Sequence, residues 1–352
     1  MATNERIERA SRLRAEQWPV EDLEAVKACP VCSNAERALL YDDLWDGSFL
    51  TAPGTWSLWR CAGCRSAYLD PRPTQASIGR AYEQYYTHAA AKTPHLKTGF
   101  ARLKDMLGNG YRNRHYGTAL HPSSSLGAVV AALIPATRRR MDHNFRFLPR
   151  LDGGNKRLLD VGCGAGYFLT VAREAGWECS GAEPDPAAAA NATARGLDVR
   201  QGGIDAWHDS PTGFDAVTMS HVMEHVPDPR ETVEAVFDLL KPGGQFYLET
   251  PNIDALSHGA FGRDWRGLET PRHLVLFTLE SLTGLLKNSG FTEIRQRQIP
   301  SPLPFLIHES ERMVALNGLG HRSAAGSDPL RIKEQAVGPK AEFLTLTCVR
   351  PE

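Results

Sequence analysis

The second half of the chain alternates short apolar runs with longer stretches whose apolar residues recur at helical spacing. A short apolar run between turn formers is typical of a buried strand, and a period near 3.6 residues is typical of an amphipathic helix. The runs that we predict as strands are 157–161, 178–183, 215–220, 245–249, 293–298 and 342–349. Strands that alternate with helices predict an α/β domain, with a parallel sheet covered by helices on both faces.

The patterns divide the chain into four parts. In chain order we predict a charged N-terminal helix, a module of short strands and turns, a helical connector and the α/β domain, at 1–27, 28–75, 76–152 and 153–352. Two insertions in the α/β domain, 251–278 and 299–340, are longer than a compact domain needs for its own stability. We expect them to form walls of a substrate site.

Composition narrows the classes of protein. The chain has 352 residues, 42% hydrophobic and 23% charged, with a formal net charge of -1, which is ordinary for a globular enzyme. Near-neutral charge argues against a dedicated nucleic-acid binder, although Arg138, Arg139 and Arg140 form a local basic run. We expect no membrane helix, because no stretch approaches the ~20 apolar residues that one needs. The charged start lacks a secretory signal, so we expect a cytoplasmic protein with reduced cysteines.

Four of the seven cysteines form two C-x-x-C pairs, Cys29 with Cys32 and Cys61 with Cys64. Two such pairs joined by a loop are typical of a tetrahedral zinc site with four cysteine ligands. A closed site of this kind leaves no position for substrate, so we expect Zn²⁺ to be structural. The alternative, two redox-active dithiols, lacks a thioredoxin-like unit around the cysteines.

A glycine-rich turn follows the first strand of the α/β domain. The strand at 157–161 leads into the sequence GCGAG at 162–166, where the backbone can approach a ligand closely. The next predicted strand ends at Glu183, and an acidic side chain there can accept the hydroxyls of a ribose. The G-x-G-x-G spacing differs from that of dinucleotide enzymes. For the turn alone, the alternative is a tight strand–helix connection that binds no ligand. Because Glu183 ends the next predicted strand, the turn and Glu183 together predict a nucleoside-containing cofactor.

Five segments in order resemble one enzyme family. They are LDVGCGAG at 159–166, EP at 183–184, FDAV at 214–217, HVMEHV at 221–226 and LKPGG at 240–244. Their order and spacing resemble the class I S-adenosylmethionine-dependent methyltransferases over about residues 155–300 and the last strand. The resemblance implies a Rossmann-like sheet of seven strands with helices on both faces, and S-adenosylmethionine as the cofactor. We expect the connector to cap the cofactor cleft.

The resemblance also assigns the cofactor to particular residues. These are Asp160, Gly162, Cys163, Gly164, Gly166, Glu183, Pro184, Gly203, Ile204 and Ser220. Gly162 and Gly164 would cradle the methionine part, Glu183 the ribose, and Gly203 with Ile204 would lie beside the adenine. Asp160 would orient the glycine turn and the amino group, and the Ser220 backbone carbonyl would accept from the same ammonium. The chain departs from many relatives at Gly203, where they have an acidic residue.

The catalytic prediction rests on two histidines. In-line methyl transfer depends mainly on orientation, and a base that takes the proton of a hydroxyl adds to it. His221 follows a predicted strand and His273 lies in the first insertion, both near the expected ligand-binding edge. Glu224 and His225 share helical spacing with His221, which could hold a divalent metal. Metal-dependent relatives have Glu-x-x-Glu-His there, whereas this chain has His221 in place of the first glutamate.

The acceptor is the least constrained part of the prediction. The cysteine pairs followed by YLDP at 68–71 and by Tyr85 and Tyr86 resemble bacterial methyltransferases of sugar, polysaccharide and natural-product biosynthesis. The residues that we predict to contact the acceptor are Tyr85, Tyr86, Asn252, Trp265 and Arg272. We therefore expect methylation of a small metabolite on oxygen or carbon. The alternatives are an RNA methyltransferase that grips RNA with the zinc module, and a cofactor-binding scaffold without activity.

Overall fold

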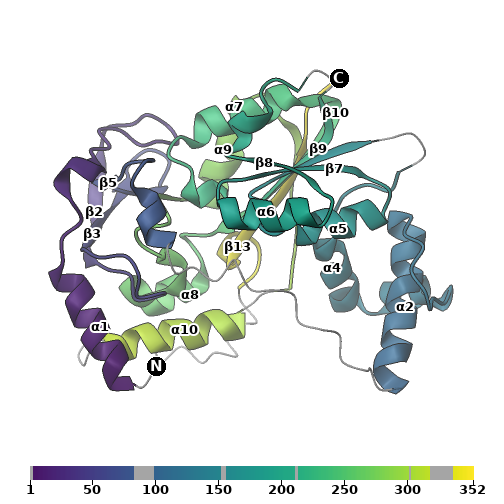
Figure 1. Ribbon diagram of the computed structural model, residues 1–352, viewed down its shortest axis with the longest axis horizontal. Coiled ribbons are helices and arrows are strands. Elements are labelled where there is room, and N and C mark those ends of the chain that lie inside the picture. The colour runs from purple at the N-terminus through teal and green to yellow at the C-terminus, as the bar shows by residue number, and fades with distance from the viewer. Residues whose placement is uncertain (1–2, 83–98, 152–155, 211–212, 301–302, 318–335) are drawn as a thin grey trace.

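A computed structural model describes residues 3–82, 99–151, 156–210, 213–300, 303–317 and 336–352. A seven-stranded sheet with its helices forms the centre, the N-terminal module lies on one side of it, and the helical connector lies on the opposite side (Figure 1). Within these ranges, no helix is both long enough and apolar enough to cross a membrane.

The central sheet has the strand order β12-β13-β10-β9-β6-β7-β8. Its strands are β6 (Arg157–Val161), β7 (Glu178–Glu183), β8 (Asp198–Gln201), β9 (Phe214–Ser220), β10 (Leu240–Pro251), β12 (Thr292–Gln296) and β13 (Phe343–Val349). The strands from β8 to β10 are parallel, and β13 runs antiparallel to both of its neighbours. The seven-stranded Rossmann-like sheet expected from the sequence is confirmed.

The strand predictions agree with the structure except for β8. Two of the six predicted runs match their strands at both ends, and the other four overlap theirs. No prediction was made for β8, because Asp198–Gln201 is short, polar and mostly exposed at the sheet edge. Without an apolar run, the period-2 signal of a buried strand is lost.

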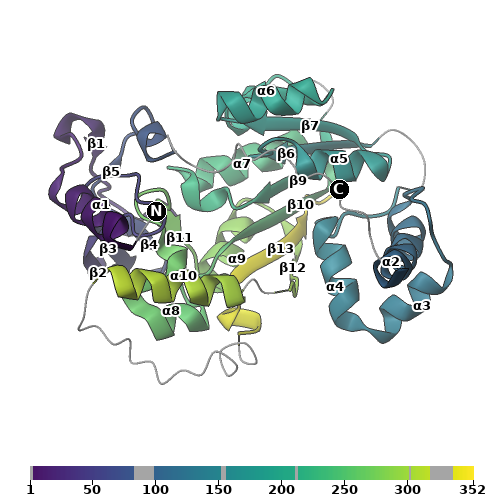
Figure 2. The ribbon, with the colours of Figure 1, turned by 60° about the horizontal axis from the view of Figure 1, so that its bottom comes forward.

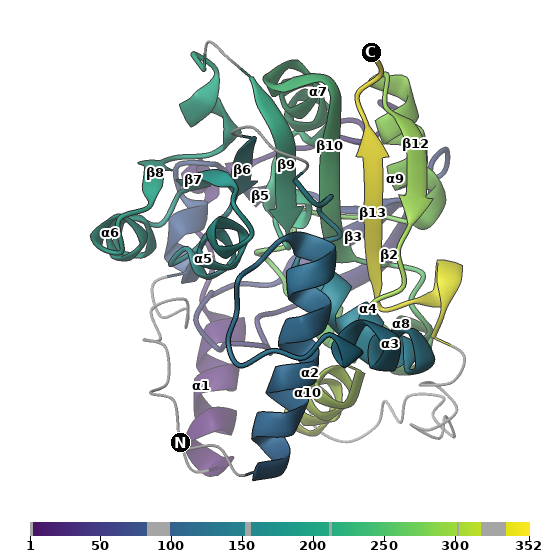
Figure 3. The ribbon, with the colours of Figure 1, turned by 90° about the vertical axis from the view of Figure 1, so that its right-hand side faces the viewer.

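Helices cover both faces of the sheet. Helix α5 (Tyr167–Glu174) and the connector pack on the sheet face that carries Leu158 and Ala216. The opposite face packs against α7 (Pro229–Leu239) and α9 (Leu279–Asn288). α6 (Pro186–Ala194) lies beside β7 and β8. Figure 3 shows the connector in front of the sheet, with α7 and α9 behind it.

The N-terminal module contains two small sheets. α1 (Thr3–Ala15) precedes β1 (Leu23–Glu24), which pairs with β5 (Arg72–Pro73). The four-stranded sheet comprises β2 (Arg37–Leu44), β3 (Trp56–Cys61), β4 (Ala67–Leu69) and β11 (Val275–Leu276), in the order β11-β4-β3-β2. Strand β11 comes from the first insertion, so the module and the α/β domain share a sheet.

The insertions hold the N-terminal module to the domain. The first contributes α8 (Leu256–Phe261) and β11, and the second contributes α10 (Leu303–Leu316), which lies beside α1 (Figure 2). Both insertions contact the N-terminal module, and the expectation that they wall a substrate site stays a prediction. The described residues of the connector contain the short 3-10 helix η2 (Ile78–Tyr82) and the helices α2 (Gly99–Tyr116), α3 (Leu126–Leu133) and α4 (Pro135–Asn144).

Candidate cofactor and acceptor site

The glycine turn after β6 has a left-handed backbone at each of its three glycines. At Gly162, φ is 70° and an added Cβ would lie 2.4 Å from Val222 Cγ2, so only glycine fits. At Gly164, φ is 54°, but an added Cβ would meet no atom within 4 Å. Gly166 begins α5 from the same conformation, with φ at 78°. The turn thus leaves open space directly above the Gly164 backbone, as a close ligand requires.

Glu183 is tied to that turn. The backbone N–H of Gly164 donates to Glu183 Oε2 at 2.7 Å, and that of Asp185 donates to Oε1 at 2.9 Å. Burial raises the pKa of Glu183, although these two hydrogen bonds oppose the shift. The end of β7 at Glu183 and the glycine turn, which were predicted as separate features, therefore lie side by side.

Asp160 lies fully buried beneath the turn and pairs with Arg146. Asp160 Oδ1 accepts hydrogen bonds from Arg146 Nη1 and, at 2.9 Å, from Thr218 Oγ1. Arg146 reaches it because residues 146 and 147 both take left-handed backbone angles after α4. Asp160 Oδ2 is buried and has no hydrogen-bond partner among the described residues. An orphaned carboxylate oxygen of this kind is costly and suits an ammonium group of a ligand.

The other predicted cofactor residues surround the turn. Cys163 is buried, Pro184 is exposed just after β7, and Ile204 begins a short 3-10 helix after Gly203. The N–H of Gly202 donates to the Glu183 carbonyl at 3.0 Å, which brings Gly203 and Ile204 next to the end of β7. Their contact with adenine stays a prediction.

A cavity of about 380 Å³ opens beside the glycine turn. It lies between α5, the connector and the carboxyl ends of β9 and β10. The lining residues are Arg112, Leu120, His143, Asn144, Phe145, Arg146, Tyr167, Phe168, Val171, Glu174, Ser220, Tyr247 and Glu249. Residues 143–146 belong to or follow the end of α4, so the connector forms part of the cavity wall, and its role as a cap over the cofactor stays a prediction.

Glu249 is the centre of a hydrogen-bond network in the cavity wall. His143 Nε2 lies 2.8 Å from Glu249 Oε2, and Tyr247 and Thr345 donate to the same oxygen at 3.0 and 2.9 Å. Burial would raise the pKa of Glu249, but His143 and His221 outweigh it and hold the pKa well below its usual range. His143 thus lies beside a buried negative charge while 29% of its side chain stays exposed.

His221 lies between two buried carboxylates. Its Nδ1 is 3.3 Å from Glu224 Oε1 and its Nε2 is 3.3 Å from Glu249 Oε1. Burial opposes protonation, but the hydrogen bonds to Glu224 and Glu249 raise the pKa of His221 to about 10. A ring whose two nitrogens both face carboxylate oxygens has no lone pair with which to accept a proton.

His273 is 5% exposed and lies away from the cavity. Its Nδ1 is 2.8 Å from the Gly267 carbonyl, and burial lowers its pKa to about 4. The ligand atoms of Glu224, His225 and His273 lie within 4.8 Å of one another, close enough for one metal ion to bind all three. The helical spacing predicted Glu224 and His225 in such a group, and the fold supplies His273 in place of His221.

The predicted acceptor contacts lie elsewhere. Trp265 and Arg272 are fully buried, and Arg272 pairs with Asp46 of the N-terminal module. Asn252 is also buried and donates to the carbonyls of Pro339 and Ala341. None of these three side chains lines the cavity. Tyr85 and Tyr86 lie outside the described residues.

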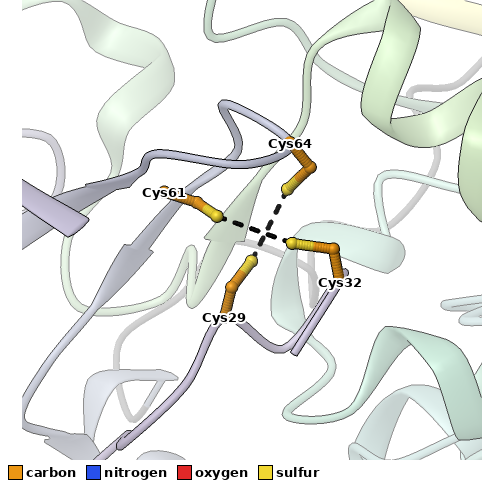
Figure 4. Close-up of side chains that lie close together, drawn as sticks. All are labelled: Cys29, Cys32, Cys61 and Cys64. Atoms are coloured by element: carbon orange, nitrogen blue, oxygen red, sulfur yellow. Dashed lines mark hydrogen bonds between the residues drawn. The ribbon is translucent and has the colours of Figure 1, made fainter. Parts of the chain in front are cut away.

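The four paired cysteines meet at one point of the N-terminal module (Figure 4). The Sγ atoms of Cys29 and Cys64 lie 3.6 Å apart, and those of Cys32 and Cys61 lie 3.5 Å apart. A Zn–S bond of about 2.3 Å implies sulfur atoms about 3.8 Å apart in a tetrahedron, so the set fits Zn²⁺. Cys29 and Cys61 are buried and Cys32 is exposed. The clustering agrees with the spacing, and the metal itself stays a prediction.

The sequence reasoning missed four polar residues of the cavity, His143, Arg146, Tyr247 and Glu249. Tyr247 and Glu249 lie on the predicted strand at 245–249, where alternation alone could have placed two polar side chains on one face. His143 and Arg146 carry no local signal, because only the packing of the connector brings them to the strand ends.

Comparison with known proteins agrees with this geometry. Residues 136–296 match a family model described as "Methyltransferase domain", and that range contains the glycine turn, Glu183 and most of the cavity wall. This part of the chain is therefore similar to a methyltransferase domain. Over 107 residues, the chain is 37% identical to the ubiquinone biosynthesis O-methyltransferase of Pectobacterium atrosepticum, covering 28% of this chain and 44% of the relative. The enzyme of the same description from Alkalilimnicola ehrlichii is 36% identical over 126 residues, covering 34% and 50%.

The chain spans about half the length of these curated relatives, so their activity is carried over only as a proposal. Solved structures with a similar arrangement include an S-adenosylmethionine-dependent methyltransferase from Mesorhizobium loti, 20% identical with a TM-score of 0.41, covering 60% of this chain and 97% of that one. A second is phosphoethanolamine N-methyltransferase 2 of Haemonchus contortus, 18% identical with a TM-score of 0.41, covering 70% and 60%. Similarity at this level adds nothing to the assignment.

Proposed function

We propose that this protein transfers a methyl group from S-adenosylmethionine to an oxygen atom of a small molecule. The observation that carries the proposal is the closed arrangement of Gly164, Glu183 and Asp160 beside a cavity with polar walls. The description of the relatives as O-methyltransferases supports oxygen over carbon. A sugar or a natural-product intermediate remains the acceptor that the N-terminal resemblance favours.

The residues that would hold the cofactor fit its three parts. The Glu183 carboxylate suits the ribose hydroxyls, and the open backbone at Gly164 suits the methionine chain. The unpaired Asp160 Oδ2 and the carbonyl of Ser220 suit the ammonium group, while Arg146 suits the carboxylate. When bound, the cofactor supplies an electrophilic methyl group.

The geometry favours His143 as the group that takes the proton of an acceptor hydroxyl. His143 lines the cavity, and Glu249 binds one ring nitrogen, which leaves the other for the acceptor. His221, predicted from the sequence, is instead held as a cation by Glu224 and Glu249 and would position groups through hydrogen bonds. His273 does not line the cavity, so a role for it would require a metal bound with Glu224.

Cofactor binding is tested first. Calorimetric titration with S-adenosylhomocysteine should give micromolar affinity, whereas NAD should not bind. Glu183→Ala removes a carboxylate that can make two charge-assisted hydrogen bonds, each worth about 1.5–3 kcal/mol. We expect a loss of affinity of roughly 100-fold or more, with the fold retained by circular dichroism. Unchanged affinity in the variant would refute the ribose assignment, and absent binding would favour a scaffold without activity.

The proton acceptor is tested separately. His143→Gln should lower kcat by about 10² to 10⁴ while the affinity for S-adenosylhomocysteine stays unchanged. His115→Gln is the matched control, because His115 lies on the same connector and stacks on Tyr111 outside the cavity lining. Equal rates for the wild type and His143→Gln would exclude His143 as the base.

A further inference from the structure

A second, smaller cavity of about 110 Å³ lies at the β12 edge of the sheet. It is enclosed by Arg139 of α4, by residues 296–299 at the end of β12, and by residues 336–338 with 341–343. Its volume equals that of about three to four water molecules, which suits one small polar group and not a whole ligand.

Two arginines give this cavity its charge. Arg297 is anchored by its Nε, which donates to Thr347 Oγ1 at 2.9 Å, and its guanidinium lies over the Phe147 ring. Its terminal nitrogens have no hydrogen-bond partner within the described ranges. Arg139 makes neither a hydrogen bond nor an ion pair with any described residue. Two guanidinium groups that share one cavity, and whose terminal nitrogens have no hydrogen-bond partner among the described residues, are the donor set that a bidentate oxyanion prefers.

The nearby acidic groups are already engaged. Glu342 also lines the cavity, but its carboxylate accepts hydrogen bonds from the hydroxyl and the backbone N–H of Ser257. Asp142, on the same helix as Arg139, accepts the hydroxyls of Tyr111 and Tyr116, each at 2.6 Å. The oxygens of both carboxylates are therefore hydrogen-bonded to neutral donors, and neither carboxylate makes a direct ion pair with Arg139 or Arg297 among the described residues.

The small cavity adjoins the proposed reaction site by two routes. Arg139 and His143 are four residues apart on α4, which places their Cβ atoms about 5–6 Å apart on one face of the helix. Phe343 lines the small cavity and packs edge-on against the His221 ring, with 4.6 Å between ring centroids. A molecule of sugar-phosphate size could thus place one end near each of Arg139 and His143.

We propose that Arg139 and Arg297 bind a phosphate group of the methyl acceptor, so that the acceptor is a phosphorylated small molecule. The inference rests on the proposed function, because it uses the cavity beside His143 as the place of methyl transfer. Phosphate is favoured over carboxylate because its three terminal oxygens can bind both guanidinium groups at once.

The site can be tested without knowing the acceptor. Equilibrium dialysis of the full chain, saturated with S-adenosylhomocysteine, against radiolabelled inorganic phosphate should show one bound phosphate per chain. Arg139→Gln and Arg297→Gln should each weaken phosphate binding at least 10-fold. Arg295→Gln is the matched control, because Arg295 lies on the same strand but pairs with Glu293 outside the cavity. It should bind phosphate as the wild type does.

The outcomes separate this inference from the proposed function. A wild-type protein that does not bind S-adenosylhomocysteine would count against the proposed function. The phosphate measurement tests only the roles of Arg139 and Arg297. Phosphate binding that is absent, or equal in the wild type and both cavity variants, would overturn the inference. Displacement of phosphate by acetate at equal concentration would overturn the assignment to phosphate.

Discussion

Replacing Arg272 with methionine should destabilise the protein without changing its chemistry. The Arg272 side chain is fully buried, and its Nη1 donates to Asp46 Oδ2 at 3.2 Å and to the Ala81 carbonyl at 2.8 Å. Its Nε donates to Glu269 Oε1 at 3.3 Å. Removing one partner of a buried ion pair leaves the other charge uncompensated, which typically costs about 3–5 kcal/mol. This is a large part of the ~5–15 kcal/mol by which a folded domain is stable.

The assay is urea unfolding followed by tryptophan fluorescence, with kcat/KM measured on the folded variant. Arg272→Met should lower the free energy of unfolding by about 3–5 kcal/mol, and the double variant with Asp46→Asn should lose about 1–3 kcal/mol less than the sum of the single losses. Arg263→Met is the control, because Arg263 lies in the same insertion and makes only exposed hydrogen bonds. A loss below about 1 kcal/mol together with a fall in kcat/KM would refute this reasoning and restore Arg272 as an acceptor contact.

Three further predictions concern other parts of the molecule. The purified protein should contain one Zn²⁺ per chain, and Cys61→Ser should release it and lower the melting midpoint by at least ~10 °C; a metal-free protein of unchanged stability would contradict this. Gly162→Ala should weaken S-adenosylhomocysteine binding at least ~10-fold, because its Cβ would meet Val222. Gly196→Ala is the control, because Gly196 has a similar φ and open space around it, and it should bind as the wild type does. Equal affinities of the two variants in calorimetry would count against cofactor binding at the glycine turn. Burial lowers the pKa of His258 from 6.5 to about 4, so its contribution to stability is present above pH 6.5 and is lost as the pH falls toward 4. Melting curves of His258→Phe should therefore be less acid-sensitive over that window than those of the wild type. A parallel pH dependence of the two proteins would exclude this shift in the pKa of His258.

The cofactor half of the site could be predicted from the sequence, because its signals are local. Strand β6, the glycine turn and Glu183 lie within 27 consecutive positions, 157–183, and each is fixed by short-range rules for strands, turns and acidic strand ends. The spacing of the four cysteines is likewise a local feature, and the structure brings their sulfur atoms together. The order of the motifs was enough to predict the seven-stranded sheet.

The proposed acceptor half of the site depends on tertiary structure. His143 and Glu249 are 106 positions apart, and they meet only because the connector packs over the sheet on the face of β10 that carries Glu249. Packing of the N-terminal module against the first insertion likewise explains why Arg272, whose residue type suits substrate binding, instead pairs with Asp46. Residue type and spacing reveal which chemistry a segment can perform. Which side chains share a cavity depends on long-range packing, and a single sequence carries no local signal for it.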